Sequence, residues 1–432
     1  MKEKEYIGRL FDKTLEFALK STGAVLVEGP KWCGKSTTCA RQAKEIVDLT
    51  PPDKREQYIN EARIAPHEFL SSREKPLMID EWQHVYFVWD QIKYEVDSAQ
   101  TFGQFILTGS VTDKAINDEN FLQNRHTGTG RIVRRKMRTM SLYESGESNG
   151  LISISELKNG KFTHARSSAT IYDYAFYICR GGWPVAVKEK DREIALAQAV
   201  NYYETVVTDD IFSLKSVRLM KDEEKARRMM KSYSRNVSIA ASDETMIKDC
   251  TENNESFDKE TFYKYLNALE ILQVTEELPA WNPNIRSKTA IRTKPTRHFV
   301  DPSIAAACLN LNPQSIFRSM DAFGLLFESM AVRDLRTYCD SIGASLYKYR
   351  DSKKREADAV IQFKDGSWAL IEVKLGGLAD VETASEKLLN IASDIDQEKT
   401  GPLAFLMVIT KDSFSYRRED GVYVVPLACL KN

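Results

Sequence analysis

One short stretch of the sequence, Gly29-Pro-Lys-Trp-Cys-Gly-Lys-Ser-Thr37, restricts the fold more than any other. It follows an apolar run, residues 23–27, and precedes a polar, alanine-containing segment, residues 38–46, that we expect to be helical. The motif G-x-x-x-x-G-K-[ST] requires this order of strand, glycine-bounded loop, Lys-Ser and helix. Its two glycines let successive backbone N–H groups point at one anion. The stretch therefore predicts a nucleotide-binding loop.

The loop also predicts which side chains meet the nucleotide. Lys35 supplies a point charge to the β- and γ-phosphates, and the Ser36 hydroxyl can bind Mg²⁺. The following helix adds the positive end of its dipole. We therefore expect ATP and Mg²⁺ as cofactors, held by Gly29, Pro30, Lys31, Trp32, Cys33, Gly34, Lys35, Ser36 and Thr37.

A second candidate segment, Pro76-Leu-Met-Ile-Asp-Glu81, has the composition of a short buried strand that ends in two carboxylates. At the carboxyl end of a strand, Asp80 can hold Mg²⁺ through water, and Glu81 can orient and deprotonate an attacking water molecule. A nucleotide kinase would not need the second carboxylate, so the pair favours hydrolysis. The alternative is an acidic strand end that only caps the next helix.

Two further segments have side chains suited to a phosphate. The buried strand Phe105-Ile-Leu-Thr-Gly-Ser110 would place Thr108 or Ser110 near the γ-phosphate if it lies beside the other strands. The basic stretch 125–138 follows, and it predicts an anionic neighbour. This neighbour could be the γ-phosphate, in cis or on another subunit, with Arg131 as an arginine finger, or a nucleic-acid backbone. A solvated basic surface is the remaining interpretation.

Together these motifs, with Thr127-Gly-Thr-Gly-Arg131 through Glu147, resemble the AAA-type ATPases of archaea and bacteria that carry an uncharacterised C-terminal domain. The resemblance implies that residues 1–150 form an ASCE-type P-loop domain. Such a domain is a parallel sheet with flanking helices and an extra strand between the Walker A and Walker B strands. The resemblance also implies functional roles for Lys35, Ser36, Asp80, Glu81, Thr108 and Arg131.

Residues 151–310 read as a helical connector with a winged-helix-like region. Residues 257–271 have the pattern of a capped helix, residues 272–278 that of a strand, and residues 285–298 form a basic loop. A winged helix would bring these elements to DNA. The predicted helix is partly acidic, however, so a winged helix that serves only for packing is an equal alternative.

Residues 311–432 suggest a C-terminal α/β domain. An amphipathic helix carries Glu328, and a hairpin follows in which period 2 places Glu372 and Lys374 on one face, with Asp358 on the adjacent strand. This order resembles the PD-(D/E)xK, or restriction-endonuclease-like, fold. The resemblance implies Mg²⁺-dependent cleavage of nucleic acid by Glu328, Asp358, Glu372 and Lys374. A salt-bridged hairpin, or a fold that binds without cutting, stays open.

Composition limits the remaining choices. The net charge of −1 means that nucleic-acid binding would require a local basic patch. No run approaches the 18 apolar residues of a membrane span, and seven scattered cysteines with five histidines show neither zinc spacing nor a disulfide framework. We expect a cytoplasmic ATPase whose C-terminal half recognises, and in one version cleaves, DNA or RNA. The alternatives are an ATP-dependent regulator or scaffold that binds DNA or a protein partner, and a homo-oligomer is required if Arg131 acts in trans.

Overall fold

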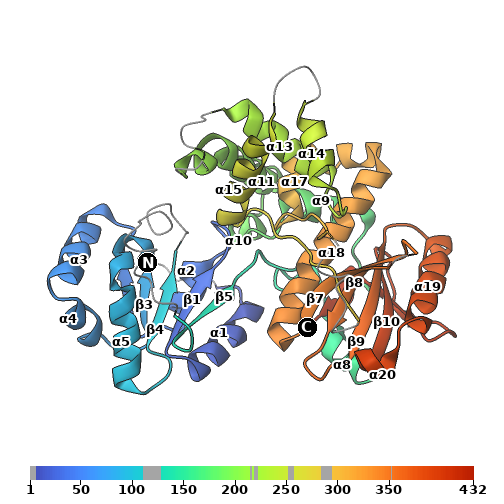
Figure 1. The fold of residues 1–432 in the computed structure, drawn as a ribbon. Coiled ribbons are helices and arrows are strands. Elements are labelled where there is room, and N and C mark those ends of the chain that lie inside the picture. The colour runs from blue at the N-terminus through green and yellow to red at the C-terminus, as the bar shows by residue number, and fades with distance from the viewer. Residues whose placement is uncertain are drawn as a thin grey trace.

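The computed structural model describes residues 6–109, 128–214, 217, 222–251, 257–283, 294–351 and 353–432. Figure 1 shows three parts: a blue sheet with helices on both faces, a green to yellow helical region, and an orange to red second sheet. Within the described ranges, no helix combines the length and the apolar character that a membrane crossing requires.

The first sheet is parallel and has the strand order β2-β3-β4-β1-β5. Strand β4 therefore lies between β1, which leads into the phosphate loop, and β3, which ends at Asp80. This is the extra strand that the ASCE arrangement predicts. The bounds are β1 Ala24–Glu28, β2 Glu45–Asp48, β3 Leu77–Asp80, β4 Phe105–Thr108 and β5 Ile132–Lys136.

Both faces of this sheet are covered because its strands are apolar on both sides. Alternate residues of β1 belong to two separate hydrophobic clusters, with Leu26 facing one set of helices and Val25 the other. The predicted helix over residues 38–46 is too long. Helix α2 ends at Ala40, and residues 45–48 form a strand that pairs with β3. One face carries α1 (Leu10–Ser21) and α2 (Lys35–Ala40); the other carries α3 (Pro52–Ile64), α4 (Pro66–Ser71), η1 (Trp82–Val88) and α5 (Trp89–Ala99).

The middle of the chain is mostly helical. The predicted helix at 257–271 is α15 (Lys259–Ile271), and the Asp258 carboxylate caps it by accepting the Thr261 N–H at 2.7 Å. The predicted strand over residues 272–278 is wrong, because its backbone makes only two isolated bridges, from Thr275 and Leu278. Most of the predicted wing, residues 284–293, lies outside the described residues.

The elements of this region precede the second sheet in the chain. They are β6 (Ile152–Ser153), α8 (Ile154–Lys158), α9 (Ile171–Arg180), α10 (Pro184–Lys188), α11 (Arg192–Thr205), the π-helical turn η2 (Val206–Asp210), η3 (Ile211–Ser213), α13 (Glu223–Arg235), α14 (Asp243–Thr251), α15, α17 (Pro302–Cys308) and η4 (Ser315–Arg318).

The second sheet is mixed, with the order β11-β12-β10-β9-β8-β7. The predicted hairpin is present as antiparallel β8 and β9, and β10 is parallel to β9 because α19 crosses between them. The bounds are α18 Met320–Ile342, β7 Ser345–Arg350, β8 Glu356–Gln362, β9 Trp368–Lys374, α19 Leu378–Ser393, α20 Gln397–Thr400, β10 Leu403–Thr410, β11 Tyr416–Arg417, β12 Tyr423–Pro426, η5 Leu427–Cys429 and β13 Leu430–Lys431.

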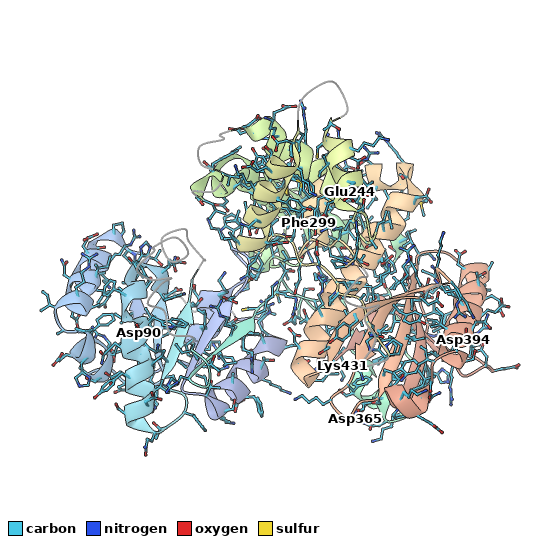
Figure 2. The ribbon with its side chains drawn as sticks, viewed as in Figure 1. Asp90, Glu244, Phe299, Asp365, Asp394 and Lys431 are labelled. Atoms are coloured by element: carbon cyan, nitrogen blue, oxygen red, sulfur yellow. The ribbon has the colours of Figure 1, made fainter. Side chains whose placement is uncertain are left out.

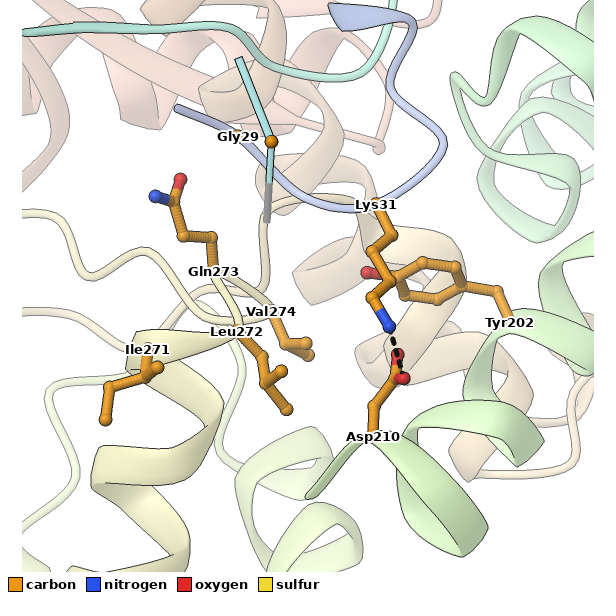
Figure 3. A pocket seen from close by; sticks show the side chains of 9 residues that line it. Gly29, Lys31, Tyr202, Asp210, Ile271, Leu272, Gln273 and Val274 are labelled. Carbon is orange, nitrogen blue, oxygen red and sulfur yellow. Dashed lines mark hydrogen bonds and ion pairs between the residues drawn. The ribbon is translucent and has the colours of Figure 1, made fainter. Parts of the chain in front are cut away.

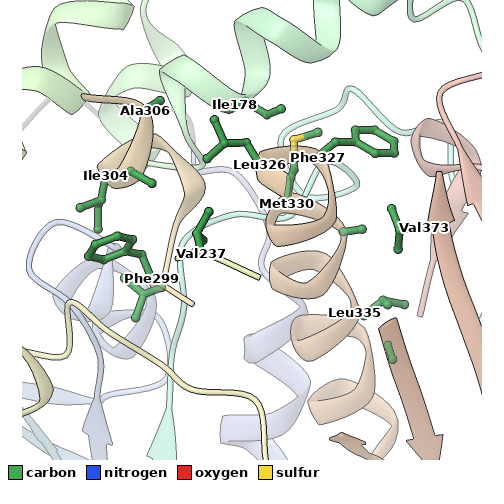
Figure 4. Close-up of a cluster of buried hydrophobic side chains, with 14 of the residues drawn as sticks. Ile178, Val237, Phe299, Ile304, Ala306, Leu326, Phe327, Met330, Leu335 and Val373 are labelled. Atoms are coloured by element: carbon green, nitrogen blue, oxygen red, sulfur yellow. The ribbon is translucent and has the colours of Figure 1, made fainter. Parts of the chain in front are cut away.

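Helix α18 joins the helical region to the second sheet. One continuous cluster of buried side chains includes Ile178 of α9, Ile304 of α17, Met330 of α18 and Val373 of β9 (Figure 4). Figure 2 shows Phe299 inside the helical region, whereas Glu244 lies on its outside. These two parts of the chain therefore share one hydrophobic core.

Candidate nucleotide-binding site

The phosphate loop connects β1 to α2 at the carboxyl edge of the first sheet. Gly34 caps α2 with φ 99°, a left-handed conformation that favours glycine. Trp32 is also left-handed, at φ 65°, which is unusual for a bulky residue and is found mainly at functional sites. The Lys35 ammonium donates to the carbonyl oxygens of Gly29 and Pro30 at 2.7 and 2.9 Å. The loop thus encircles its own lysine.

Ser36 and Asp80, the two side chains predicted to bind Mg²⁺, lie next to each other. The Ser36 hydroxyl donates to Asp80 Oδ1 at 3.0 Å. Burial raises the pKa of Asp80 to about 6; the Ser36 hydrogen bond opposes this rise, and the carboxylates of Glu81 and Asp48 add to it. A cation would relieve this excess of negative charge.

The donor set at this position fits Mg²⁺ rather than a metal held by protein alone. Among the described residues, no group of three or more His, Cys, Asp or Glu side chains could hold a metal ion. Mg²⁺ usually keeps several waters and binds one or two carboxylates together with substrate phosphates. Ser36 and Asp80 would supply the protein ligands, and the ion would neutralise phosphate charge.

Glu81 and Thr108 lie at the same edge of the sheet. Glu81 is left-handed, at φ 56°, and its carboxylate accepts a hydrogen bond from the Gln83 side-chain amide. Thr108 is paired in register with Asp80, and its fully buried hydroxyl has no hydrogen-bond partner in the described part of the chain. Sequence reasoning missed Gln83, although it follows Glu81 by only two residues. Ser110, the alternative to Thr108, lies outside the described residues.

A pocket of about 810 Å³ opens above the loop, and two parts of the chain line it. Its floor is the phosphate loop with Glu81. Its far wall comes from the helical region, through α10, α11, η3 and the residue after α15. No sequence pattern predicted this wall. The described lining residues are Lys31, Trp32, Gly34, Lys35, Ser36, Thr37, Glu81, Gln83, His84, Pro184, Val185, Gln198, Ser213 and Leu272.

The turn Arg180-Gly-Gly-Trp-Pro184 explains how this wall is held in place. The Met140 N–H donates to Gly182 O at 2.7 Å, and a Cβ on Gly182 would lie 2.1 Å from Met140 O. Only glycine allows this close backbone contact. Pro184 then sits over Gly34, 3.5 Å from the position of an added Cβ. The turn therefore docks the helical region against the phosphate loop.

Arg131 is not brought to the phosphate loop. It precedes β5, and its carbonyl accepts the N–H of Ala24 at the start of β1, while the loop follows the end of β1. Because β1 and β5 are parallel, Arg131 lies at the opposite edge of the sheet. Its Nε contacts both Asp97 oxygens at 2.8 Å. The fold therefore does not support an arginine finger acting in cis, and action in trans stays a prediction.

Three other cations of the described basic stretch, Arg134, Lys136 and Arg138, meet carboxylates of the same chain. Arg134 contacts Glu28 at 2.6 Å. Arg138 binds Glu276 with two nitrogens, at 2.7 and 2.8 Å, and also contacts Asp340. Burial opposes ionisation of Glu276, but Arg138 and Arg336 hold the pKa of this carboxyl well below its usual range. The anionic neighbours are therefore partly protein groups, which tie the first sheet to the other two parts.

The four candidate nuclease residues lie together on α18, β8 and β9. Lys348 Nζ stands 3.4 Å from Glu328 Oε1 and 3.9 Å from Asp358 Oδ1. Glu372 accepts hydrogen bonds from Lys374, at 2.8 Å, and from Lys387. Burial, with Asp358 nearby, raises the pKa of Glu328 to about 8, against the effect of Lys348. Each of these three carboxylates thus has a lysine close to it.

Comparison with known proteins finds a family-model match for each of the three parts. Residues 21–145 match the family model described as an AAA domain, and residues 171–315 and 323–430 match two domains of unknown function (DUF8612 and DUF4143). No curated protein matches the chain. The AAA match supports an AAA-type P-loop ATPase domain and, with it, ATP binding. The predicted restriction-endonuclease-like fold of the C-terminal part is not supported, because residues 323–430 match only a domain of unknown function.

Solved structures show only distant similarity. A Walker-type ATPase of Pyrococcus abyssi is 13% identical, with a TM-score of 0.41, over 71% of this chain and 97% of that one. The ORC2 protein of Aeropyrum pernix is 10% identical, with a TM-score of 0.29, over 72% and 92% of the respective chains. These scores are too low to support a conclusion about the whole fold.

Proposed function

We propose that this chain binds ATP with Mg²⁺ and hydrolyses it at the pocket between the first sheet and the helical region. The observation that carries the proposal is the hydrogen bond between the Ser36 hydroxyl and the buried Asp80 carboxylate. This contact supports the proposal because Ser36 and Asp80, which would be the protein ligands of an Mg²⁺ ion, meet beside the phosphate loop, where the metal would neutralise phosphate charge.

Four other side chains complete the proposed reaction site. Lys35 donates hydrogen bonds to phosphate oxygens. These replace the hydrogen bonds that it donates to the loop carbonyls in the structure. Glu81 accepts a proton from the attacking water, and Gln83 holds its carboxylate in position. The Thr108 hydroxyl, which has no hydrogen-bond partner among the described residues, contacts the attacking water or the terminal phosphate.

Replacing Lys35 by alanine is the first test. We expect affinity for ATP to fall about 10- to 100-fold, because charge-assisted hydrogen bonds to phosphate are lost. Isothermal titration calorimetry with ATP and Mg²⁺ measures this change. Lys54→Ala, on the surface helix α3, is the matched control and should bind as the wild type does. Wild-type protein that binds neither ATP nor ADP would overturn the proposed function.

A second candidate activity is Mg²⁺-dependent recognition or cleavage of nucleic acid by the C-terminal part. Two neighbouring groups of charges favour it: Glu328 and Asp358 lie beside Lys348, and Glu372 lies beside Lys374. A metal that entered this cluster would have to displace Lys348 from Glu328 and Asp358, and Lys374 and Lys387 from Glu372. We therefore propose cleavage as conditional on Mg²⁺ and a bound nucleic acid.

The second candidate is tested by incubating supercoiled, branched and single-stranded DNA with Mg²⁺, with and without ATP. We expect cutting to fall at least about tenfold in Asp358→Asn, which keeps an oxygen to accept the Val373 N–H but loses the charge. Asp365→Asn, in the turn of the same hairpin, should cut normally. Absence of cutting with ATP hydrolysis intact would favour the regulator or scaffold alternative.

A further inference from the structure

Lys31, the third residue of the phosphate loop, lies at the boundary between two spaces. Its side chain lines the 810 Å³ pocket together with Ser36 and Glu81. It also lines a narrow cavity of about 10 Å³ between the loop and the helical region, with Tyr202, Asp210 and residues 271–274. Figure 3 shows the ammonium pointing from the loop toward Asp210. Lys31 can therefore meet a nucleotide on one side and the helical region on the other.

On the helical side, Lys31 Nζ contacts Asp210 Oδ1 at 2.5 Å. The two partners differ in exposure, since the Lys31 side chain is 43% exposed and that of Asp210 only 12%. Asp210 ends the π-helical turn that continues α11, the helix that supplies Gln198 to the nucleotide pocket. Short π-helical turns inside helices occur often at functional sites. The more exposed partner is thus on the loop, and the more buried carboxylate ends a turn that continues a helix lining the large pocket.

Charge determines what Lys31 does when a nucleotide arrives. The described residues that line the large pocket include two with a positive side chain, Lys31 and Lys35. Arg131 is not among them, since it lies at the other edge of the sheet. Both ammonium groups are held by oxygens of the chain itself, Lys35 by loop carbonyls and Lys31 by Asp210. A terminal phosphate carries more negative charge than one carboxylate and competes with it for an ammonium group.

We propose that Lys31 moves from Asp210 to the terminal phosphate, so that Asp210 determines how strongly the chain prefers ATP over ADP. The proposal rests on ATP binding at this loop. The terminal phosphate meant here is the γ-phosphate of ATP. ADP lacks it, so the ion pair between Lys31 and Asp210 persists when ADP is bound. ATP breaks the pair and frees the π-helical turn. The competing interpretation is a fixed tie between the loop and the helical region, which would affect both nucleotides alike.

The test is a double-mutant cycle measured by isothermal titration calorimetry with Mg²⁺ and either ADP or a non-hydrolysable ATP analogue. Asp210→Asn should tighten binding of the analogue about three- to tenfold and change ADP affinity less than about twofold, because only the analogue competes for Lys31. Lys31→Met should weaken the analogue by about tenfold. Adding Asp210→Asn to Lys31→Met should then have no further effect.

Controls separate the possible failures. Glu204→Gln removes an ion pair between Glu204 on α11 and Arg227 on α13, at 2.7 Å, and should leave both affinities unchanged. Lys31→Arg keeps the charge and should preserve the preference for the ATP analogue. Equal effects of Asp210→Asn on both ligands, or the same effect in the Lys31→Met background, would overturn the inference. Wild-type protein that binds neither ligand would instead overturn the proposed function.

Discussion

Replacing Glu81 by glutamine is expected to slow ATP hydrolysis by about 10²- to 10⁴-fold, the usual contribution of a general base. Glutamine has the same shape and can still accept a hydrogen bond from Gln83, but it cannot take a proton from water. Phosphate release under saturating ATP measures the rate, and calorimetry measures binding. ATP affinity should stay within a few-fold of wild type, because Ser36, Asp80 and Lys35 are unchanged.

Glu56→Gln is the matched control for this variant. Glu56 lies exposed on the surface helix α3 of the same domain, so this change should leave the rate of hydrolysis unaltered. If Glu81→Gln hydrolysed ATP at the wild-type rate, the base would have to be another group at this edge of the sheet. If it lost ATP binding as well, Glu81 would be acting on the architecture of the site rather than on the chemistry.

The first sheet could be predicted from sequence because its information is local. The phosphate loop and the segment ending in Asp80 each combine an apolar strand with polar residues at its carboxyl end, and parallel pairing then brings these ends together. The contact between Ser36 and Asp80 follows from this rule. The roles of the individual side chains remain predictions that the experiments above address.

Features that depend on distant contacts could not be predicted. The run of positive charge before Arg138 carries no information about strand register, so the sequence could not place Arg131 at the far edge of the sheet. Nor does any local pattern pair Arg138 with Glu276, which lies more than a hundred residues further along the chain. The pocket wall at Pro184 and Leu272 has the same origin, because it forms only when the helical region docks.

Replacing Arg333 by methionine should reduce the free energy of unfolding by about 3–5 kcal/mol, the usual effect of breaking a buried ion pair from one side. Arg333 is 2% exposed and contacts Asp301 at 3.2 Å and Asp334 at 2.7 Å. Asp301 also accepts the Thr139 hydroxyl, and Asp334 accepts the Leu142 N–H. The variant would therefore leave two buried carboxylates without their cation where the three parts of the chain meet.

The effect of pH gives this prediction a second readout. Burial raises the pKa of Asp334 to about 6 even though Arg333 opposes the rise, and without Arg333 that pKa should rise further. A raised pKa in the folded state means that stability is lost as pH increases through it. The difference in stability between variant and wild type should thus be largest near pH 8 and shrink toward pH 6.

Urea unfolding followed by tryptophan fluorescence measures both effects, with Arg131→Met as the control. Arg131 also pairs with a carboxylate, Asp97, but the two side chains are 42% and 53% exposed, so its loss should cost at most about 1 kcal/mol. Equal losses in the two variants would show that the Arg333 cluster adds nothing beyond a surface pair. A larger, pH-dependent loss in Arg333→Met would show that this buried charge holds the nucleotide-binding part against the helical region and the second sheet.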